Sequence, residues 1–113
     1  GNGGGLVINS IPLTQGVAYE GQAKGLEYSY YYLNPVAPGS HTVTVSNMFD
    51  STCVWIYDES DGKFNAGSIV YSGTNNATTP DKSLTYSFTS GVFMEVRGCG
   101  SSVTGTAFTI TVN

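Results

Sequence analysis

Charged side chains are scarce in this chain, and their scarcity limits the partners it can bind. Of the 113 residues 11% are charged, with 4 Lys and Arg against 8 Asp and Glu, for a formal net charge of −4. The basic residues are scattered as Lys24, Lys63, Lys82 and Arg97. Because no basic patch is present to neutralise phosphates, we expect no nucleic-acid partner. No apolar run is long enough to span a bilayer, so we expect no membrane partner.

Histidine is almost absent, which limits the catalysis that this chain can support. His41 is the sole histidine, and Ser40 precedes it. Neighbouring side chains in a strand point to opposite faces, so these two are not placed for nucleophilic catalysis. A catalytic zinc site normally needs two or three histidines, or a histidine with a carboxylate at helical spacing, and the sequence has neither. We therefore predict a non-catalytic chain.

Carboxylates gather at one place, in the stretch that contains Asp58, Glu59 and Asp61. Its composition predicts a turn open to water. An open turn offers no burial to separate two carboxyl pKa values for acid–base chemistry. Oxygen ligands at this spacing can surround calcium, so the three residues are weak calcium candidates. We expect no other metal or cofactor.

Alternating apolar and polar residues dominate the rest of the chain, which holds 15 Gly and 8 Tyr. No useful stretch shows the roughly 3.6-residue period of a helix. About nine short strands are predicted, with a polar loop at 73–80, and the strand candidates are 6–8, 16–21, 26–33, 42–46, 53–57, 68–71, 84–88, 92–99 and 106–112. This pattern predicts an all-β fold, either an antiparallel β-sandwich or a jelly roll. We expect residues 1–10 to be a linker and first strand, and 11–113 to be one domain.

The two cysteines lie on two of the predicted strands. Cys53 opens an alternating run through Tyr57, and Cys99 closes another that begins at Val92. Two cysteines in a small, Gly- and Thr-rich chain favour a disulfide, which implies an oxidising, extracellular location. The alternative is a pair of buried thiols.

The sole Trp shares a strand face with the first cysteine. If Val54 and Ile56 point inward, Cys53, Trp55 and Tyr57 point outward. Cysteines directly opposite each other would place Trp55 opposite Arg97 and Tyr57 opposite Glu95. We then expect a cation–π contact of Arg97 with the indole of Trp55, and a flat platform made of Trp55, Tyr57 and Phe93. Exposed aromatics suit stacking on sugar rings or packing against a fibrous protein. The alternative is that a loop or a neighbouring domain covers them. The predicted ligand-binding residues are Trp55, Tyr57, Phe93, Arg97 and Tyr31, whereas Tyr28, Tyr86, Phe88 and Phe108 are assigned to the core.

The order of motifs resembles that of the bacterial pre-peptidase C-terminal domain family. The resemblance begins with the stretch Leu13 to Gly21 and continues through Tyr30 to Leu33 and the Pro-Gly turn with its Thr/Val strand, Pro38 to Val45. Val54 to Asp58 is similar to the family's central strand, and Phe93 to Gly98 to its late strand. With the final strand, 106–112, the resemblance covers roughly residues 11–113.

The resemblance implies a β-sandwich jelly roll without catalytic activity, attached to a secreted bacterial hydrolase that is often a protease. Such a domain would adhere to an insoluble protein substrate, and its partner in the parent chain would be an N-terminal catalytic domain. Alternatives are a carbohydrate-binding module for a polysaccharide and a secretion or maturation domain that is cleaved off. Relatives that bind collagen hold calcium through acidic residues in their N-terminal segment, and residues 1–10 contain none.

Overall fold

The computed structural model describes residues 10–46, 52–59, 68–75, 82–99 and 106–113. Within these ranges the regular elements are all strands, and no helix is long and apolar enough to cross a membrane. The nine strands are β1 (Ile11–Pro12), β2 (Tyr19–Ala23), β3 (Ser29–Leu33), β4 (Gly39–Ser46), β5 (Thr52–Glu59), β6 (Ser68–Asn75), β7 (Lys82–Phe88), β8 (Gly91–Gly98) and β9 (Thr106–Val112).

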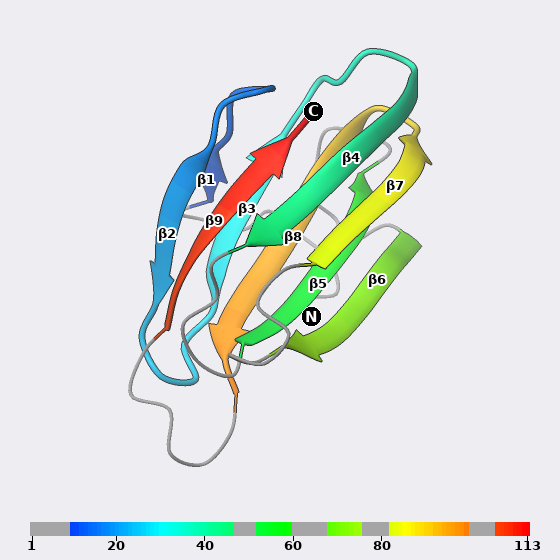
Figure 1. The fold of residues 1–113 in the computed structure, drawn as a ribbon. Coiled ribbons are helices and arrows are strands. Elements are labelled where there is room, and N and C mark those ends of the chain that lie inside the picture. The colour runs from blue at the N-terminus through cyan, green and yellow to red at the C-terminus, as the bar shows by residue number, and fades with distance from the viewer. Residues whose placement is uncertain (1–9, 47–51, 60–67, 76–81, 100–105) are drawn as a thin grey trace.

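The strands form two sheets packed face to face (Figure 1). One has five strands in the order β1-β3-β8-β5-β6, and the other has four in the order β2-β9-β4-β7. From β2 to β9 every connection except β5–β6 crosses between the sheets. This strand order is that of a jelly roll, so the predicted fold class is confirmed. Among the described strands only β1 and β3 pair in parallel.

Alternation along each strand places apolar side chains between the sheets. Val43 and Val45 of β4 lie in one buried cluster with Val54 and Ile56 of β5. Thr42 and Thr44, at the intervening positions of β4, point away from this cluster. Burial of branched apolar side chains between the two inner faces holds the sheets together at the spacing usual for a β-sandwich.

Two of the four aromatics assigned to the core from the sequence do lie there. Phe88 and Phe108 are both 2% exposed, which confirms that part of the prediction. Tyr28 and Tyr86 are 38% and 36% exposed, so their assignment to the core was wrong. Tyr86 lies on β7, an edge strand whose side chains are less covered, and Tyr28 lies just before β3 begins.

Several predicted boundaries differ from those observed. The expected strand at 6–8 lies outside the described residues, and the first observed strand is β1. The prediction that a turn begins at Asp58 is wrong for Asp58 and Glu59, because β5 continues to Glu59. The prediction of a loop at 73–80 is wrong for residues 73–75, because β6 continues to Asn75. In both places pairing with a neighbouring strand overrides polar composition.

Candidate binding surface on the five-stranded sheet

The outer face of the five-stranded sheet carries the residues singled out from the sequence. In β5, Val54 and Ile56 belong to the inner core, so Trp55 and Tyr57 lie on the opposite face. In β8 the inner residues are Val92, Met94 and Val96. Phe93, Glu95 and Arg97 therefore share the outer face with Trp55 and Tyr57. The predicted orientation of these strands is confirmed.

Aromatic rings pack against one another on this face. We use the name outer aromatic cluster for the set made of Tyr57, Phe93, Tyr30, Tyr32 and Trp55. The rings of Tyr30 and Phe93 stack with centroids 6.1 Å apart, and those of Tyr57 and Phe93 are 5.8 Å apart. The cluster is a second, smaller apolar core on the outside of the sandwich.

The outer aromatic cluster corrects the expected flat platform of Trp55, Tyr57 and Phe93. Tyr57 is 5% exposed and Phe93 1%, so both face outward yet are covered. Trp55 is half-buried. Alternation determined the face correctly, but it could not show that the rings contributed by β3 pack over that face.

Trp55 of this cluster also contacts two side chains outside it, Tyr28 and Arg97, and we call these three the Tyr28–Trp55–Arg97 surface. The rings of Tyr28 and Trp55 are 5.6 Å apart and tilted by 47°. The guanidinium carbon of Arg97 lies 5.6 Å from the centre of each ring. The expected cation–π contact with Trp55 is therefore present, and Tyr28 is an additional participant that sequence reasoning missed. The sequence does contain an indication of this, because Tyr28, Tyr30 and Tyr32 are spaced two residues apart and would share one face of a strand.

A buried carboxylate lies beneath this surface. Glu95 is fully buried, and the Tyr57 hydroxyl donates a hydrogen bond of 2.7 Å to its Oε1. Burial raises the pKa of the Tyr57 hydroxyl far above its ordinary value, and the bond to Glu95 raises it further. Burial and then the charge of Glu95 also raise the pKa of Tyr30. The cluster is thus built around neutral tyrosines.

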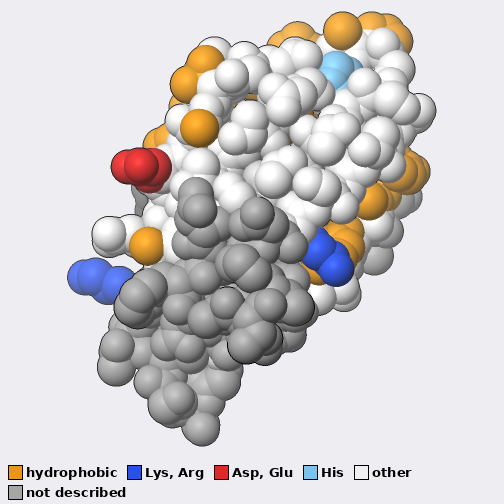
Figure 2. Space-filling view, in the orientation of Figure 1, with side chains coloured by type: hydrophobic (Ala, Val, Ile, Leu, Met, Phe, Trp, Pro, Cys, Tyr) orange, Lys and Arg blue, Asp and Glu red, His pale blue; other side chains and the backbone are white. Residues whose placement is uncertain are grey.

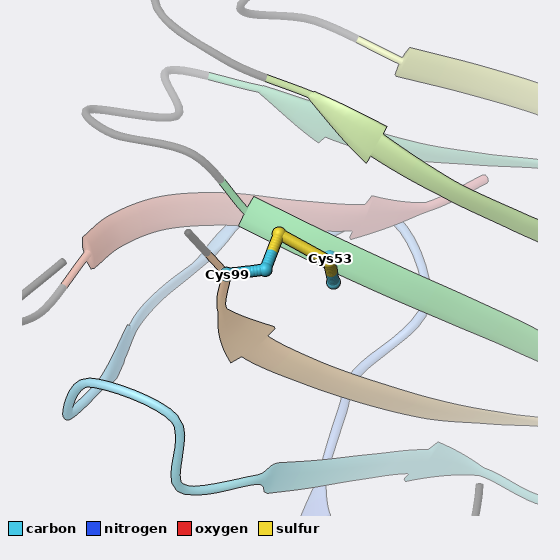
Figure 3. Close-up of a disulfide and its surroundings, with 2 residues drawn as sticks. All are labelled: Cys53 and Cys99. Atoms are coloured by element: carbon cyan, nitrogen blue, oxygen red, sulfur yellow. A yellow bond between two sulfur atoms is a disulfide. The ribbon is translucent and has the colours of Figure 1, made fainter. Parts of the chain in front are cut away.

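The predicted disulfide is confirmed, and it closes the end of the β5–β8 pair beside the surface (Figure 3). Cys53 and Cys99 are bonded with a Cα–Cα distance of 5.6 Å. The register is not the one expected, because Cys53 pairs with Arg97 and Trp55 with Glu95. Cys99 lies just beyond β8, so the crosslink runs diagonally. Arg97 consequently lies directly across from one cysteine and two residues before the other.

Tyr31, the remaining predicted ligand-binding residue, lies in the inner core. It is 1% exposed, and its ring packs edge-on against Phe108 at 5.8 Å. Its hydroxyl donates to Ser29 at 3.1 Å. Burial raises the pKa of Tyr31, and the Ser29 hydrogen bond opposes that rise in part. The structure thus places Tyr31 on the opposite side of the sheet from the candidate surface.

The predicted open turn with calcium candidates is not what surrounds Asp58 and Glu59. Both are buried at the end of β5. The amide and hydroxyl of Thr89 donate to the two carboxylate oxygens of Asp58 at 2.8 and 2.7 Å. The side-chain amide of Asn34 donates to Glu59, and the Ser90 hydroxyl donates to the Glu59 carbonyl at 2.8 Å.

These contacts give the two carboxylates a structural role at one end of the sandwich. Asp58 and Glu59 are adjacent in a strand, so their side chains point to opposite faces. Asp61, the third candidate, lies outside the described residues. In the part of the chain that the structure describes, no group of three or more His, Cys, Asp or Glu is placed to hold a metal. Calcium at Asp58, Glu59 and Asp61 therefore gains no geometric support.

His41 is buried at 7% exposure and joins two main-chain segments. Its Nε2 lies 2.6 Å from the Ala37 carbonyl oxygen, and its Nδ1 lies 3.1 Å from the main-chain oxygen of Asn113. Ser40 is exposed, as expected for its neighbour in a strand. The imidazole thus ties the loop before β4 to the segment after β9.

The outer face of the four-stranded sheet carries paired hydroxyl groups where the five-stranded sheet carries aromatic rings. Hydroxyl pairs connect β4 to β7, with Thr42 and Thr85 2.9 Å apart and Thr44 and Ser83 3.1 Å apart. In Figure 2, the described part of this side is mostly white, the colour of the backbone and of uncharged polar side chains, with few charged groups. Without exposed aromatics among these hydroxyls, it is a weaker candidate for a binding surface.

Comparison with known proteins identifies the fold. No family model matches the sequence, and no curated protein matches it. Among solved structures, the pre-peptidase C-terminal domain of a Bacillus anthracis collagenase matches with a TM-score of 0.64 at 12% identity, over 92% of this chain and 94% of that one.

Two lysozyme inhibitors share the same fold. A periplasmic inhibitor of g-type lysozyme from Aeromonas hydrophila has a TM-score of 0.61 at 13% identity, over 93% of this chain and 95% of that one. The corresponding protein of Salmonella Typhimurium has a TM-score of 0.54 at 12% identity, over 93% of this chain and 99% of that one. The chain therefore has the β-sandwich fold of the collagenase pre-peptidase C-terminal domain, which is also the fold of these two inhibitors.

Proposed function

We propose that this chain is a non-catalytic accessory domain of a secreted bacterial hydrolase, and that it holds the parent enzyme on an insoluble substrate. The observation that carries the proposal is the Tyr28–Trp55–Arg97 surface. Aromatic residues and Arg are enriched where proteins bind partners, and Lys and Glu are depleted there. Tyr28 is 38% exposed, which is high for a ring that stacks on a neighbouring tyrosine.

The remaining features fit such a module. The Cys53–Cys99 disulfide suits a protein that works outside the cytoplasm. A rigid sandwich presents its outer face without rearrangement, which lowers the cost of binding. The fold neighbour from a collagenase favours a protease as the parent enzyme and a protein as the substrate. In this proposal the catalytic domain precedes the chain and is its covalent partner.

A sedimentation assay tests the proposal. The purified chain is mixed with insoluble collagen, chitin, cellulose or agar, and the bound fraction is measured for wild type, Trp55→Ala and Tyr86→Ala. Tyr86 is a matched control because it is a tyrosine with 36% exposure on the other sheet. We expect binding to collagen that Trp55→Ala reduces about tenfold and Tyr86→Ala leaves unchanged.

Other outcomes of the same assay decide between the alternatives. Binding to a polysaccharide alone would make the chain a carbohydrate-binding module. Binding to none of the four would favour a secretion or maturation domain without a ligand. Binding that Trp55→Ala does not alter would place the site elsewhere on the molecule.

A second candidate function follows from the other fold neighbours. Two inhibitors of g-type lysozyme share this sandwich, so inhibition of a lysozyme is also a reasonable proposal. Its test is the rate at which a g-type lysozyme clears a bacterial cell-wall suspension, with and without an excess of this chain. Strong slowing at micromolar concentration would favour the inhibitor, and an unchanged rate would eliminate it.

A further inference from the structure

We propose that the Tyr28–Trp55–Arg97 surface recognises carboxylate side chains of an insoluble protein, with Arg97 as the residue that contacts them. The inference rests on the adhesion proposed above and specifies the chemistry of its target.

Arg97 lies against two aromatic rings. Its guanidinium carbon is 5.6 Å from the ring centres of both Tyr28 and Trp55. Its Nε is buried and, in the described part of the chain, has no hydrogen-bond partner. Cation–π contacts leave the in-plane N–H donors of a guanidinium unused, and those donors match a carboxylate in a two-pronged geometry. The two rings therefore orient the half-buried Arg97, and because its Nε is buried, a carboxylate from outside meets the terminal N–H groups of the guanidinium.

The main chain holds Arg97 in this place. Cys53 pairs directly with Arg97 across the β5–β8 ladder, and Cys99 follows it by two residues. The disulfide therefore closes the end of the ladder around Arg97 and resists fraying there. A donor held in advance loses less conformational entropy when its partner arrives.

The arrangement of the rings favours a protein over a polysaccharide. Tyr28 and Trp55 are tilted by 47°, so they offer no common plane on which a flat sugar chain could stack. Arg97 also lies over both rings and occupies the space that a pyranose would need. A branched protein surface, with a carboxylate for Arg97 and apolar groups beside it, fits such an angled site better.

The surrounding charges make the attraction short-ranged. Glu95 lies two residues before Arg97 on the same face and is fully buried. The whole chain carries a net charge of −4, which repels acidic partners at a distance. The net charge of the chain gives acidic partners no long-range attraction toward this surface. Arg97 therefore selects a carboxylate only when the two surfaces are in contact. Each contact is weak, and firm adhesion requires several on one fibre.

Two probes test the inference. The first is soluble poly-L-glutamate, titrated while the fluorescence of Trp55 is followed, because Trp55 is the sole Trp and reports on this site alone. The second is insoluble collagen whose carboxylates are either intact or converted to neutral amides. The variants are Arg97→Gln, Arg97→Lys and, as a charge-matched control on an exposed turn, Lys24→Gln.

We expect poly-L-glutamate to change the fluorescence of wild type, with an affinity about tenfold weaker in Arg97→Gln. Arg97→Lys, which keeps the charge but loses the planar fork, should be intermediate, and Lys24→Gln should match wild type. Wild type should bind amidated collagen about as weakly as Arg97→Gln binds the intact fibre. Urea unfolding of each variant shows whether a loss reflects the site or the fold.

Several results would overturn the inference. An unchanged Trp55 signal with poly-L-glutamate contradicts it, whatever the adhesion assay shows. Equal binding to intact and amidated collagen, with Trp55→Ala still defective, leaves adhesion standing and removes only carboxylate recognition. A response to polygalacturonate without one to poly-L-glutamate makes the target an acidic polysaccharide, which also contradicts the proposal as stated.

Discussion

Arg97 lies over the indole of Trp55 although the two residues do not pair across the sheet. Their contact at 5.6 Å is diagonal, because Arg97 pairs with Cys53 and Trp55 with Glu95. A long side chain reaches a diagonal neighbour easily in a twisted antiparallel ladder. This geometry joins the disulfide, the cation and the aromatic edge into one unit at the end of the five-stranded sheet.

Removal of the disulfide should cost much of the stability of the chain. The crosslink joins residues separated by 46 positions, and the chain-entropy model assigns such a loop about 4 kcal/mol of unfolding free energy. We expect the double variant Cys53→Ala/Cys99→Ala to lose roughly that amount in urea unfolding. A loss below about 1 kcal/mol would mean that packing alone closes the β5–β8 end.

Loss of the Tyr57 hydroxyl should destabilise the outer aromatic cluster. Tyr57→Phe removes the 2.7 Å hydrogen bond to the buried Glu95 while keeping the ring in place. We expect a loss of about 1–3 kcal/mol in the free energy of unfolding. Tyr86→Phe is the control, since that exposed position should change stability by less than about 0.5 kcal/mol. Equal effects at the two positions would contradict the role assigned to the buried pair.

Stability should decline in alkali because of buried tyrosines. The pKa values of Tyr30, Tyr31 and Tyr57 are raised in the folded protein, mainly by burial. Below the unfolded tyrosine pKa of about 10 this contribution to stability is fully present. It falls as the pH rises above about 10 toward the raised folded values, because the unfolded chain ionises first. Urea midpoints measured at increasing pH should fall, and less steeply in Tyr57→Phe. Identical slopes in the two proteins would contradict the raised pKa of Tyr57.

Gly21 should not tolerate a side chain. A Cβ there would lie 2.5 Å from the Phe108 ring and 2.7 Å from the Tyr31 hydroxyl, both in the packed core. We expect Gly21→Ala to lose roughly 1–3 kcal/mol in the free energy of unfolding. Gln22→Ala, an exposed neighbour on β2, is the control and should be close to neutral. Wild-type stability in Gly21→Ala would show that β2 can move away from β9.

The strands and their faces could be predicted from the sequence because alternation is a local property. The final strand was predicted at 106–112, where β9 lies, and Val54 and Ile56 face the core as expected. The jelly-roll architecture followed from the motif order, which the observed sheet order bears out.

What the sequence could not show is what covers each face. Phe93 and Tyr57 point outward but are buried, because rings from β3 pack over them. Asp58 and Glu59 look like a solvated turn until Thr89, Ser90 and Asn34 supply their hydrogen bonds from distant parts of the chain. The diagonal disulfide depends on a register that alternation leaves open. All three depend on contacts between strands far apart in sequence.

The central claim is that the Tyr28–Trp55–Arg97 surface attaches this chain to an insoluble substrate. The most direct test is the equilibrium binding isotherm on insoluble collagen for wild type, Trp55→Ala and Tyr86→Ala, each confirmed as folded by urea unfolding. We predict saturable binding of wild type and Tyr86→Ala with the same affinity, and about tenfold weaker binding of Trp55→Ala. Three superimposable isotherms, or no binding by wild type, would contradict the claim.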